Sequence, residues 1–199
     1  MKIIGITGGV GAGKSTVLDH MEKQWGAFVI QADKVGHLVM EPGEECYIPM
    51  IELLGKDIIK EDKTIDRRRV SDVVFSQAEL LEKLNAVIHP AVKRCIKKQL
   101  EDQRRLGRKL CVVEAALLLE DNYQDFCDEI WYIHTDKEVR ISRLMDSRGY
   151  TRQKAEDIIA SQAPEEFFRA HADYVVENNG DLASTCQQIQ EGIKRYETL

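Results

Sequence analysis

Short apolar runs alternate with longer amphipathic segments along the 199-residue chain. The first run, Lys2–Thr7, is largely apolar and β-branched, which is typical of a parallel strand buried on both faces. In the next segment, Ser15–Trp25, apolar residues recur at spacings of one, three and four, which predicts a helix packed on a sheet. Four further apolar runs predict strands at 27–30, 110–113, 130–133 and 174–176. Strands that alternate with helices indicate an α/β fold with a parallel sheet.

The stretch between the second and third predicted strands has helical spacing throughout, as far as about Leu106. This pattern predicts a helical lobe inserted into the sheet domain. Within it, Asp66 is placed to cap one helix. His89-Pro90 predicts a break in a later helix, after which Pro90 opens the next one.

After the fourth predicted strand, capping residues and a glycine predict where the helices begin and end. Thr135 or Asp136 is expected to cap a helix that Gly149 ends, and Thr151 is expected to start the next one. The final helix is predicted at 182–196.

Glycines gather directly after the first strand, in Gly8-Gly9-Val10-Gly11-Ala12-Gly13-Lys14-Ser15-Thr16. The run fits the phosphate-binding pattern G-x-x-x-x-G-K-[ST], in which backbone N–H groups cradle phosphates. Lys14 would reach the β and γ phosphates, and the Ser15 hydroxyl would reach Mg²⁺. A strand before the loop and a helix after it are the context that the pattern requires. The loop therefore predicts binding of a nucleoside triphosphate with magnesium.

Composition is that of a globular protein, with 43% apolar and 31% charged residues. The net charge of −6 does not favour nucleic-acid binding, and no apolar stretch approaches the ~20 residues of a membrane span. The five scattered cysteines include no C-x-x-C pair, so neither a zinc site nor a disulfide framework is indicated. We therefore expect a cytoplasmic protein that binds neither nucleic acid nor membrane.

The chain lacks the guanine-reading N-K-x-D of switch GTPases, which favours a small-molecule kinase. A kinase needs a group that orients or deprotonates the acceptor hydroxyl. Asp33 follows the second strand, and ligands gather at the carboxyl ends of parallel strands, so Asp33 is the best candidate base. The alternative is that Asp33 caps the next helix, and both roles are compatible. A kinase of another nucleotide or metabolite and a non-enzymatic nucleotide-binding module are the alternatives.

Two other features have candidate chemistry. Glu114 ends the third strand and is placed either to order Mg²⁺ through water or simply as the polar end of a strand. A basic segment split by Gly149 resembles a lid that closes over phosphates. Within that segment, Arg143 and Arg148 are the candidate catalytic arginines.

Taken in order, these motifs and several others resemble the dephospho-coenzyme A kinase family over nearly the whole chain. The carrying segments are Ile4–Thr16, Gln31-Ala32-Asp33, Glu41-Pro42-Gly43, Ile65-Asp66-Arg67, His89-Pro90, Leu117–Glu120, Gln162 and Ala172–Gly180.

The resemblance implies a P-loop NTPase fold of the nucleoside-monophosphate-kinase type, with a five-stranded parallel sheet, a helical substrate-binding insertion and a lid. In this chain the core would be about 1–41, 107–146 and 172–199, the substrate lobe about 42–106, and the lid about 147–171. The implied reaction transfers the γ-phosphoryl group of ATP to the ribose 3′-hydroxyl of dephospho-coenzyme A, giving coenzyme A and ADP.

The resemblance also implies a set of site residues. Those that would hold ATP and Mg²⁺ are Gly11, Ala12, Gly13, Lys14, Ser15, Thr16, Asn178 and Gly180. Glu114 is a further candidate metal ligand on the ground of its position after the third strand, not of the resemblance. Those on the acceptor side are Thr7, His89 and Asp33, with Asp33 as the base.

This chain departs from the family pattern at four places, one of which is Glu114, because another residue is common at its position. Gln31 replaces the first aspartate of the family's D-A-D, so Asp33 or Glu114 would have to take over any role of that carboxylate with the metal. Ala116 stands where proline is usual. Ser147 occupies the expected position of a lid arginine, with Arg148 beside it.

Overall fold

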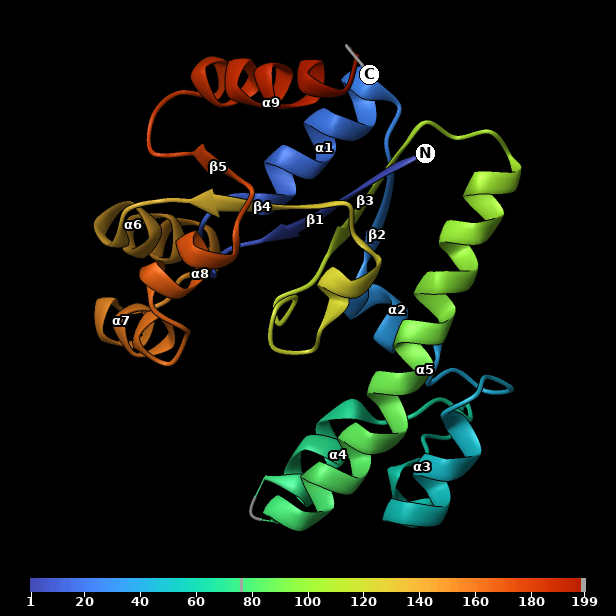
Figure 1. The fold of residues 1–199 in the computed structure, drawn as a ribbon. Helices are drawn as coiled ribbons and strands as arrows, with labels where there is room; N and C mark the ends of the chain where they lie inside the picture. The colour runs from blue at the N-terminus through green and yellow to red at the C-terminus, as the bar shows by residue number, and fades with distance from the viewer. Residues whose placement is uncertain (76, 198–199) are drawn as a thin grey trace. The chain divides into compact units, whose positions relative to one another are not determined.

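The computed structural model describes residues 1–75 and 77–197, which fall into two compact units (Figure 1). We call residues 1–29 with those from 103 onward the sheet unit, and residues 30–102 the helical unit. The predicted core, lobe and lid ranges stay predictions. Positions 76, 198 and 199, which fall within the predicted lobe and core, lie outside the described residues.

The sheet has five strands in the order β2-β3-β1-β4-β5, and this confirms the predicted fold class. The strands are β1 (Lys2–Thr7), β2 (Phe28–Gln31), β3 (Leu110–Glu114), β4 (Glu129–His134) and β5 (Tyr174–Glu177). The pairs β1–β3, β1–β4 and β4–β5 are parallel, with Ile4 opposite Val112 and Ile6 opposite Trp131. Each of the five predicted strands is therefore present: β1 has the predicted bounds, β2 is shifted by one residue, and β3, β4 and β5 are longer than predicted by one or two residues.

The main core of the sheet unit lies between the sheet and helices α1 (Lys14–Trp25) and α9 (Leu182–Glu197), which lie side by side in Figure 1. Its fully buried members include Ile4, Ile6, Val17, Met21, Trp131, Ile133, Val176 and Ile189. Gly192 permits this packing, because a Cβ there would come within 2.5 Å of the Trp131 ring. The spacing that predicted the first helix thus corresponds to its buried face.

Three further helices of the sheet unit follow β4: α6 (Lys137–Arg148), α7 (Arg152–Ala160) and α8 (Glu165–His171). Gly149 ends α6 in the left-handed conformation, and the Thr151 hydroxyl caps α7 by accepting from the Lys154 N–H, as predicted. Asp136 holds the N-cap position of α6, but its side chain makes no capping bond. A 3₁₀ turn, η2 (Tyr123–Phe126), precedes β4.

The helical unit contains α2 (Ala32–Leu38), α3 (Tyr47–Leu54), the 3₁₀ turn η1 (Lys56–Ile58), α4 (Arg67–Val74) and most of α5 (Ala78–Arg105). Asp66 caps α4 as predicted and accepts from the N–H groups of Arg68 and Arg69. The expectation of helix throughout is wrong between η1 and α4, where an antiparallel bridge joins Ile59 to Ile65.

The predicted helix break at His89-Pro90 is also wrong, because α5 runs through Pro90 for 28 residues. A proline inside a helix removes one backbone hydrogen bond and costs about 3 kcal/mol. Buried residues on both sides of Pro90 continue one apolar stripe, and that packing outweighs the local cost. The stripe consists of Leu84, Ala91, Val92, Ile96 and Leu100.

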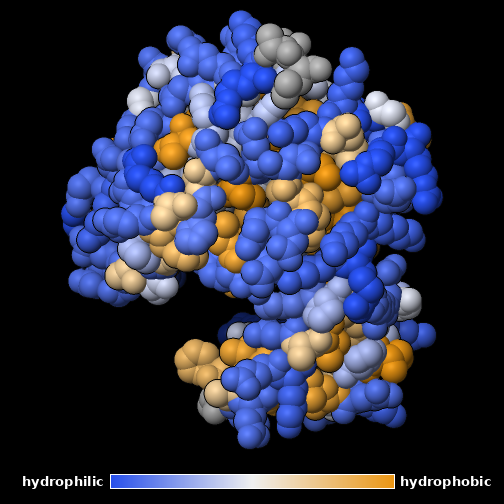
Figure 2. Space-filling view, in the orientation of Figure 1, coloured by the Kyte–Doolittle hydropathy of each residue, from blue (hydrophilic) through white to orange (hydrophobic). Residues whose placement is uncertain are grey.

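The surface in view is mostly hydrophilic, with apolar patches on both units (Figure 2). The exposed large apolar side chains of the helical unit are Leu38, Ile48, Phe75 and Leu81. Within the described part of the chain, no helix combines the length and apolarity needed to cross a bilayer.

Candidate functional site

The glycine loop joins β1 to α1, and its glycines are required by its shape. Gly8 has a φ of 147°, and a Cβ there would lie 2.6 Å from the Ile133 carbonyl oxygen. Gly13 has a φ of 83°, and a Cβ there would clash with the side-chain amide of Asn178. A side chain at either position would therefore distort the loop.

Lys14 is the first residue of α1, so its ammonium group and the positive end of the helix dipole lie at the same loop. Its Nζ donates to the Gly8 carbonyl oxygen at 2.7 Å and lies 3.7 Å from Glu114 Oε1. The lysine and glutamate side chains are only 15% and 11% exposed. Such a loop, with its helix N-terminus and its lysine, is suited to bind phosphate groups.

Two of the predicted metal ligands are close to Lys14: Ser15 follows it in α1, and the Glu114 carboxylate lies 3.7 Å from its Nζ. No group of three or more histidine, cysteine or acidic side chains that could hold a metal ion occurs among residues 1–75 and 77–197. Mg²⁺ bound with nucleotide phosphates needs only one or two protein oxygen ligands, so this donor set fits it.

Thr7 is fully buried at the end of β1, directly before the loop. Its hydroxyl is without a hydrogen-bond partner in the described part of the chain. An unsatisfied buried hydroxyl beside a phosphate loop is consistent with the predicted binding role.

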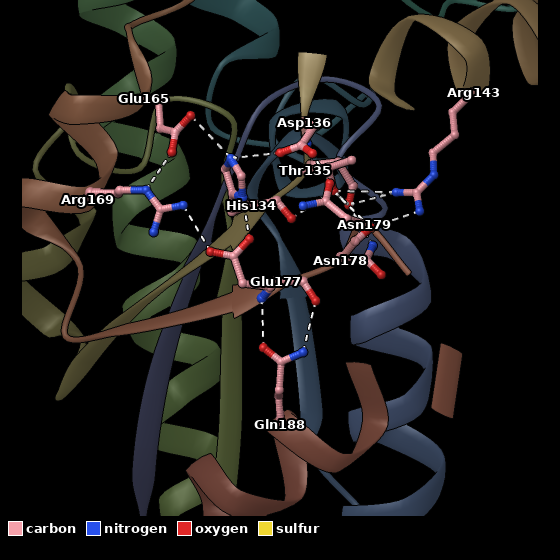
Figure 3. A network of polar contacts seen from close by, with 11 residues as sticks. His134, Thr135, Asp136, Arg143, Glu165, Arg169, Glu177, Asn178, Asn179 and Gln188 are labelled. Atoms are coloured by element: carbon pink, nitrogen blue, oxygen red, sulfur yellow. Dashed lines mark hydrogen bonds and ion pairs between the residues drawn. The ribbon is translucent and has the colours of Figure 1, made fainter. Parts of the chain in front are cut away.

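The carbonyl of Ala12, in the middle of the loop, accepts three side-chain hydrogen bonds. The donors are Asn178 Nδ2 at 2.7 Å, Thr135 Oγ1 at 3.1 Å and Arg143 Nη1 at 3.5 Å (Figure 3). Arg143 Nη2 also donates to the Asn178 carbonyl at 2.8 Å, and Thr185 donates to Asn178 Oδ1. The structure thus brings two predicted residues, Arg143 and Asn178, to the loop through its backbone.

Two other residues at the loop, Arg140 and Gln162, were not among the predicted site residues, although Arg140 belongs to the basic segment before Gly149 and Gln162 is one of the positions of the family resemblance. Arg140 Nε donates to the Val10 carbonyl at 2.8 Å, and the Val10 N–H donates to Gln162 Oε1 at 3.1 Å. Arg140 Nη2 also donates to Gln162 Oε1. One signal was available in the sequence: Arg140 and Arg143 are three residues apart and share a helix face.

A second missed cluster surrounds His134, the last residue of β4, which is 6% exposed (Figure 3). One ring nitrogen of His134 contacts Glu177, and the other lies 3.2 Å from Glu165. Arg169 bridges the same two carboxylates, at 2.5 Å from Glu165 and 2.9 Å from Glu177. Gln188 holds both backbone groups of Glu177. The cluster fixes the end of β5, directly before Asn178.

Charge and burial act against each other on Glu177. Burial alone would raise the pKa of its carboxyl, but hydrogen bonds from His134 and Arg169 outweigh burial and hold that pKa below its ordinary value. For Glu165, the hydrogen bond from Arg169 is the main cause that lowers the pKa. Both carboxylates are therefore stabilised in the ionised form.

The acceptor-side candidates Asp33 and His89 belong to the helical unit. Asp33 lies exposed in the first turn of α2, whose N-cap is Gln31, so Asp33 is not the capping residue. One turn later, His37 contacts the Arg67 guanidinium. His89 lies half-buried within the continuous α5.

The remaining candidates lie at the surface of the sheet unit. Arg148 is the exposed last residue of α6, Gly180 is exposed in the turn after β5, and Ser15 and Thr16 are exposed at the start of α1.

Comparisons with known proteins agree on one family. A family model described as dephospho-CoA kinase matches residues 2–184. A dephospho-CoA kinase of Geobacter sulfurreducens is 35% identical over 191 residues, which cover 96% of each chain. The solved dephospho-CoA kinase from Campylobacter jejuni is 25% identical, with a TM-score of 0.74 over 98% of both chains. A solved protein from Thermus thermophilus is 29% identical, with a TM-score of 0.83, over 98% of this chain and 97% of its own.

Proposed function

The chain belongs to the dephospho-CoA kinase family and is an ATP-dependent phosphotransferase, and we propose here which of its residues hold ATP and which activate the acceptor. The reaction moves the γ-phosphoryl group of ATP to the ribose 3′-hydroxyl of dephospho-coenzyme A, giving coenzyme A and ADP. The observation that carries the assignment is an intact phosphate loop within a family match that spans residues 2–184.

On the donor side, the loop from Gly11 to Thr16 binds the ATP phosphates through backbone N–H groups and the Lys14 ammonium. Lys14 is held by Gly8 and Glu114, so its charge stays at the loop before the nucleotide arrives. Asn178 and Gly180, beside the loop and after β5, line the adenine end of the donor site.

Ser15 and Glu114 would hold the magnesium ion, the serine through its hydroxyl and the glutamate directly or through water. The ion supplies charge neutralisation for the transferring phosphoryl group. Gln31 offers only a neutral amide where the family has a carboxylate. Glu114 and Asp33 would therefore have to supply the negative charge that faces the metal ion.

On the acceptor side, Asp33 accepts the proton of the ribose 3′-hydroxyl. The ribose 3′ oxygen then bonds to the γ-phosphorus, and the bond between the γ-phosphorus and the ADP oxygen breaks. The exposed place of Asp33 in the first turn of α2, directly after β2, supports this role, since ligands gather at the carboxyl ends of parallel strands. Thr7 and His89 complete the acceptor side. Arg143 and Arg148 are the cations proposed for the lid.

We also propose a cytoplasmic location. All five cysteines, which lie in the described part of the chain, are unpaired, as a reducing compartment would keep them.

A coupled ADP-release assay with dephospho-coenzyme A, AMP and dCMP as acceptors tests the substrate. We expect ADP release with dephospho-coenzyme A, and Lys14→Ala should abolish it while circular dichroism and the melting temperature show an intact fold. Faster turnover of AMP or dCMP would assign the chain another acceptor. Slow hydrolysis that no acceptor accelerates would point instead to a nucleotide-binding regulatory module.

A further inference from the structure

Val10 is the residue at which the phosphate loop meets the helices after β4. Its side chain packs against a small buried cluster formed by Ile141 and Leu144 of α6 and Ala155 of α7. The first half of the loop is therefore attached to α6 and α7 by apolar contacts, independently of any bound nucleotide.

The backbone of Val10 is held as well, at both of its polar groups. Its N–H donates to Gln162 Oε1 at 3.1 Å, and its carbonyl accepts from Arg140 Nε at 2.8 Å. Arg140 Nη2 and Gln162 Oε1 are themselves hydrogen-bonded, so three bonds close a ring through this one peptide residue. Gln162 follows the end of α7, and Arg140 lies in the first turns of α6.

The guanidinium of Arg140 lies directly on the loop. A Cβ at Gly9 would clash with its Cζ and Nη2 atoms, so glycine at this position leaves room for the arginine. Burial lowers the pKa of Arg140 from its ordinary value. Within the described residues its hydrogen-bond partners are neutral, and no carboxylate pairs with it. A half-buried positive charge with neutral partners is complemented by an anion, which at this loop would be a phosphate group.

We propose that Arg140 and Gln162 are positioning residues of the donor site. They lock the Val10 peptide to α6 and α7, so that the loop and these helices bind ATP as one unit. Gln162 acts twice, because one amide oxygen orients both the loop N–H and the guanidinium. The proposal goes beyond the assigned site residues, and it rests on the assignment of the loop to ATP.

The first test compares kinetic constants of Gln162→Leu with those of the wild type. Removing the shared acceptor leaves the Val10 N–H and one Arg140 N–H without their partner, so we expect the KM for ATP to rise by roughly tenfold. The KM for dephospho-coenzyme A should change less than twofold. The matched control is Gln153→Leu on α7, because among the described residues the Gln153 amide donates only to Asp157 on the same helix. That control should leave both KM values unchanged.

The second test changes Arg140 and Gln162 singly and together. Arg140→Gln should raise the KM for ATP as Gln162→Leu does, and the double variant should cost little more than either single change, because the residues act as one unit. Arg140→Lys keeps the charge but cannot reproduce both hydrogen bonds, so it should recover part of the loss. Additive effects in the double variant would show that the two residues act separately, and would overturn the proposal.

Hydrogen exchange at the Val10 amide gives a readout that does not depend on turnover. Protection of this amide without nucleotide should be present in the wild type and in Gln153→Leu, and lost in Gln162→Leu. Unchanged protection, or an equal rise in the KM values of both substrates with a lower melting temperature, would reduce Gln162 to a general structural role. Failure of wild-type ATP binding would instead overturn the donor assignment of the loop.

Discussion

The side-chain amide of Asn178 donates a 2.7 Å hydrogen bond to the carbonyl of Ala12, 166 residues earlier in the chain. The bond joins the end of β5 to the middle of the phosphate loop. Asn178 is only 6% exposed, and its amide oxygen is satisfied in turn by the Thr185 hydroxyl. The loop is therefore shaped by a segment that comes near the end of the chain as well as by its own glycines.

Asn178→Asp should destabilise the protein, because a carboxylate cannot donate to Ala12 and would face the carbonyl oxygen instead. We expect a loss of about 2 kcal/mol, or a melting temperature lower by roughly 4–8 °C. Asn179→Asp is the matched control, since Asn179 is exposed and its side-chain oxygen still accepts from the Asp136 N–H. Equal melting temperatures for the two variants would contradict the importance of the Ala12 contact.

Local patterns sufficed to predict the sheet and the loop. The β-branched runs are short and continuous, and the glycine positions have a backbone conformation that few other residues adopt. The loop could be predicted because its function and its shape depend on the same residues. The ends set by Gly149 and Thr151 were predictable for the same reason, because each end is determined by the residue that occupies it.

Contacts distant in sequence were not predictable in this way. Pro90 has a local signal for a break, yet the buried stripe from Leu84 to Leu100 continues the helix through it. The cluster around His134 joins residues from β4, α8 and β5, and no local spacing connects them. Arg140 and Gln162 contact each other and the Val10 backbone, but they are 22 residues apart, and no local spacing connects them.

Replacing two helical glycines by alanine should change the free energy of unfolding in opposite directions. In α9, a Cβ at Gly192 would lie 2.5–2.9 Å from the Trp131 and Tyr174 rings, so Gly192→Ala should cost about 1–3 kcal/mol through overpacking. In α2, the nearest atom to a Cβ at Gly36 is 3.9 Å away, so Gly36→Ala should stabilise by up to about 1 kcal/mol through helix propensity. Chemical denaturation of both variants measures the difference. A stabilising Gly192→Ala would mean that the rings move aside at no cost.

The pKa shift of Glu177 predicts a dependence of stability on pH. Because its pKa is lower in the folded than in the unfolded chain, its contribution is complete above the ordinary glutamate value of about 4.3 and is lost as pH falls through the folded pKa. Glu177→Gln should therefore be less stable than the wild type at pH 7, and the difference in stability should disappear as pH falls below the folded pKa of Glu177. Urea unfolding across this range provides the measurement, with Glu22→Gln, an exposed change on α1, as the control. If the difference in stability between the wild type and Glu177→Gln widened as the pH fell, the pKa of Glu177 could not be lowered by folding.

The proposed base gives the sharpest kinetic prediction. Asp33→Asn keeps the size of the side chain and removes its ability to accept a proton, so kcat should fall by roughly 10²- to 10⁴-fold. The Kd for ATP should change little, because a base acts mainly in the transition state. Asp57→Asn is the matched control, since Asp57 is another exposed aspartate of the helical unit and has no proposed role. If kcat survives in Asp33→Asn while the affinity for dephospho-coenzyme A falls, Asp33 binds the acceptor and does not take its proton.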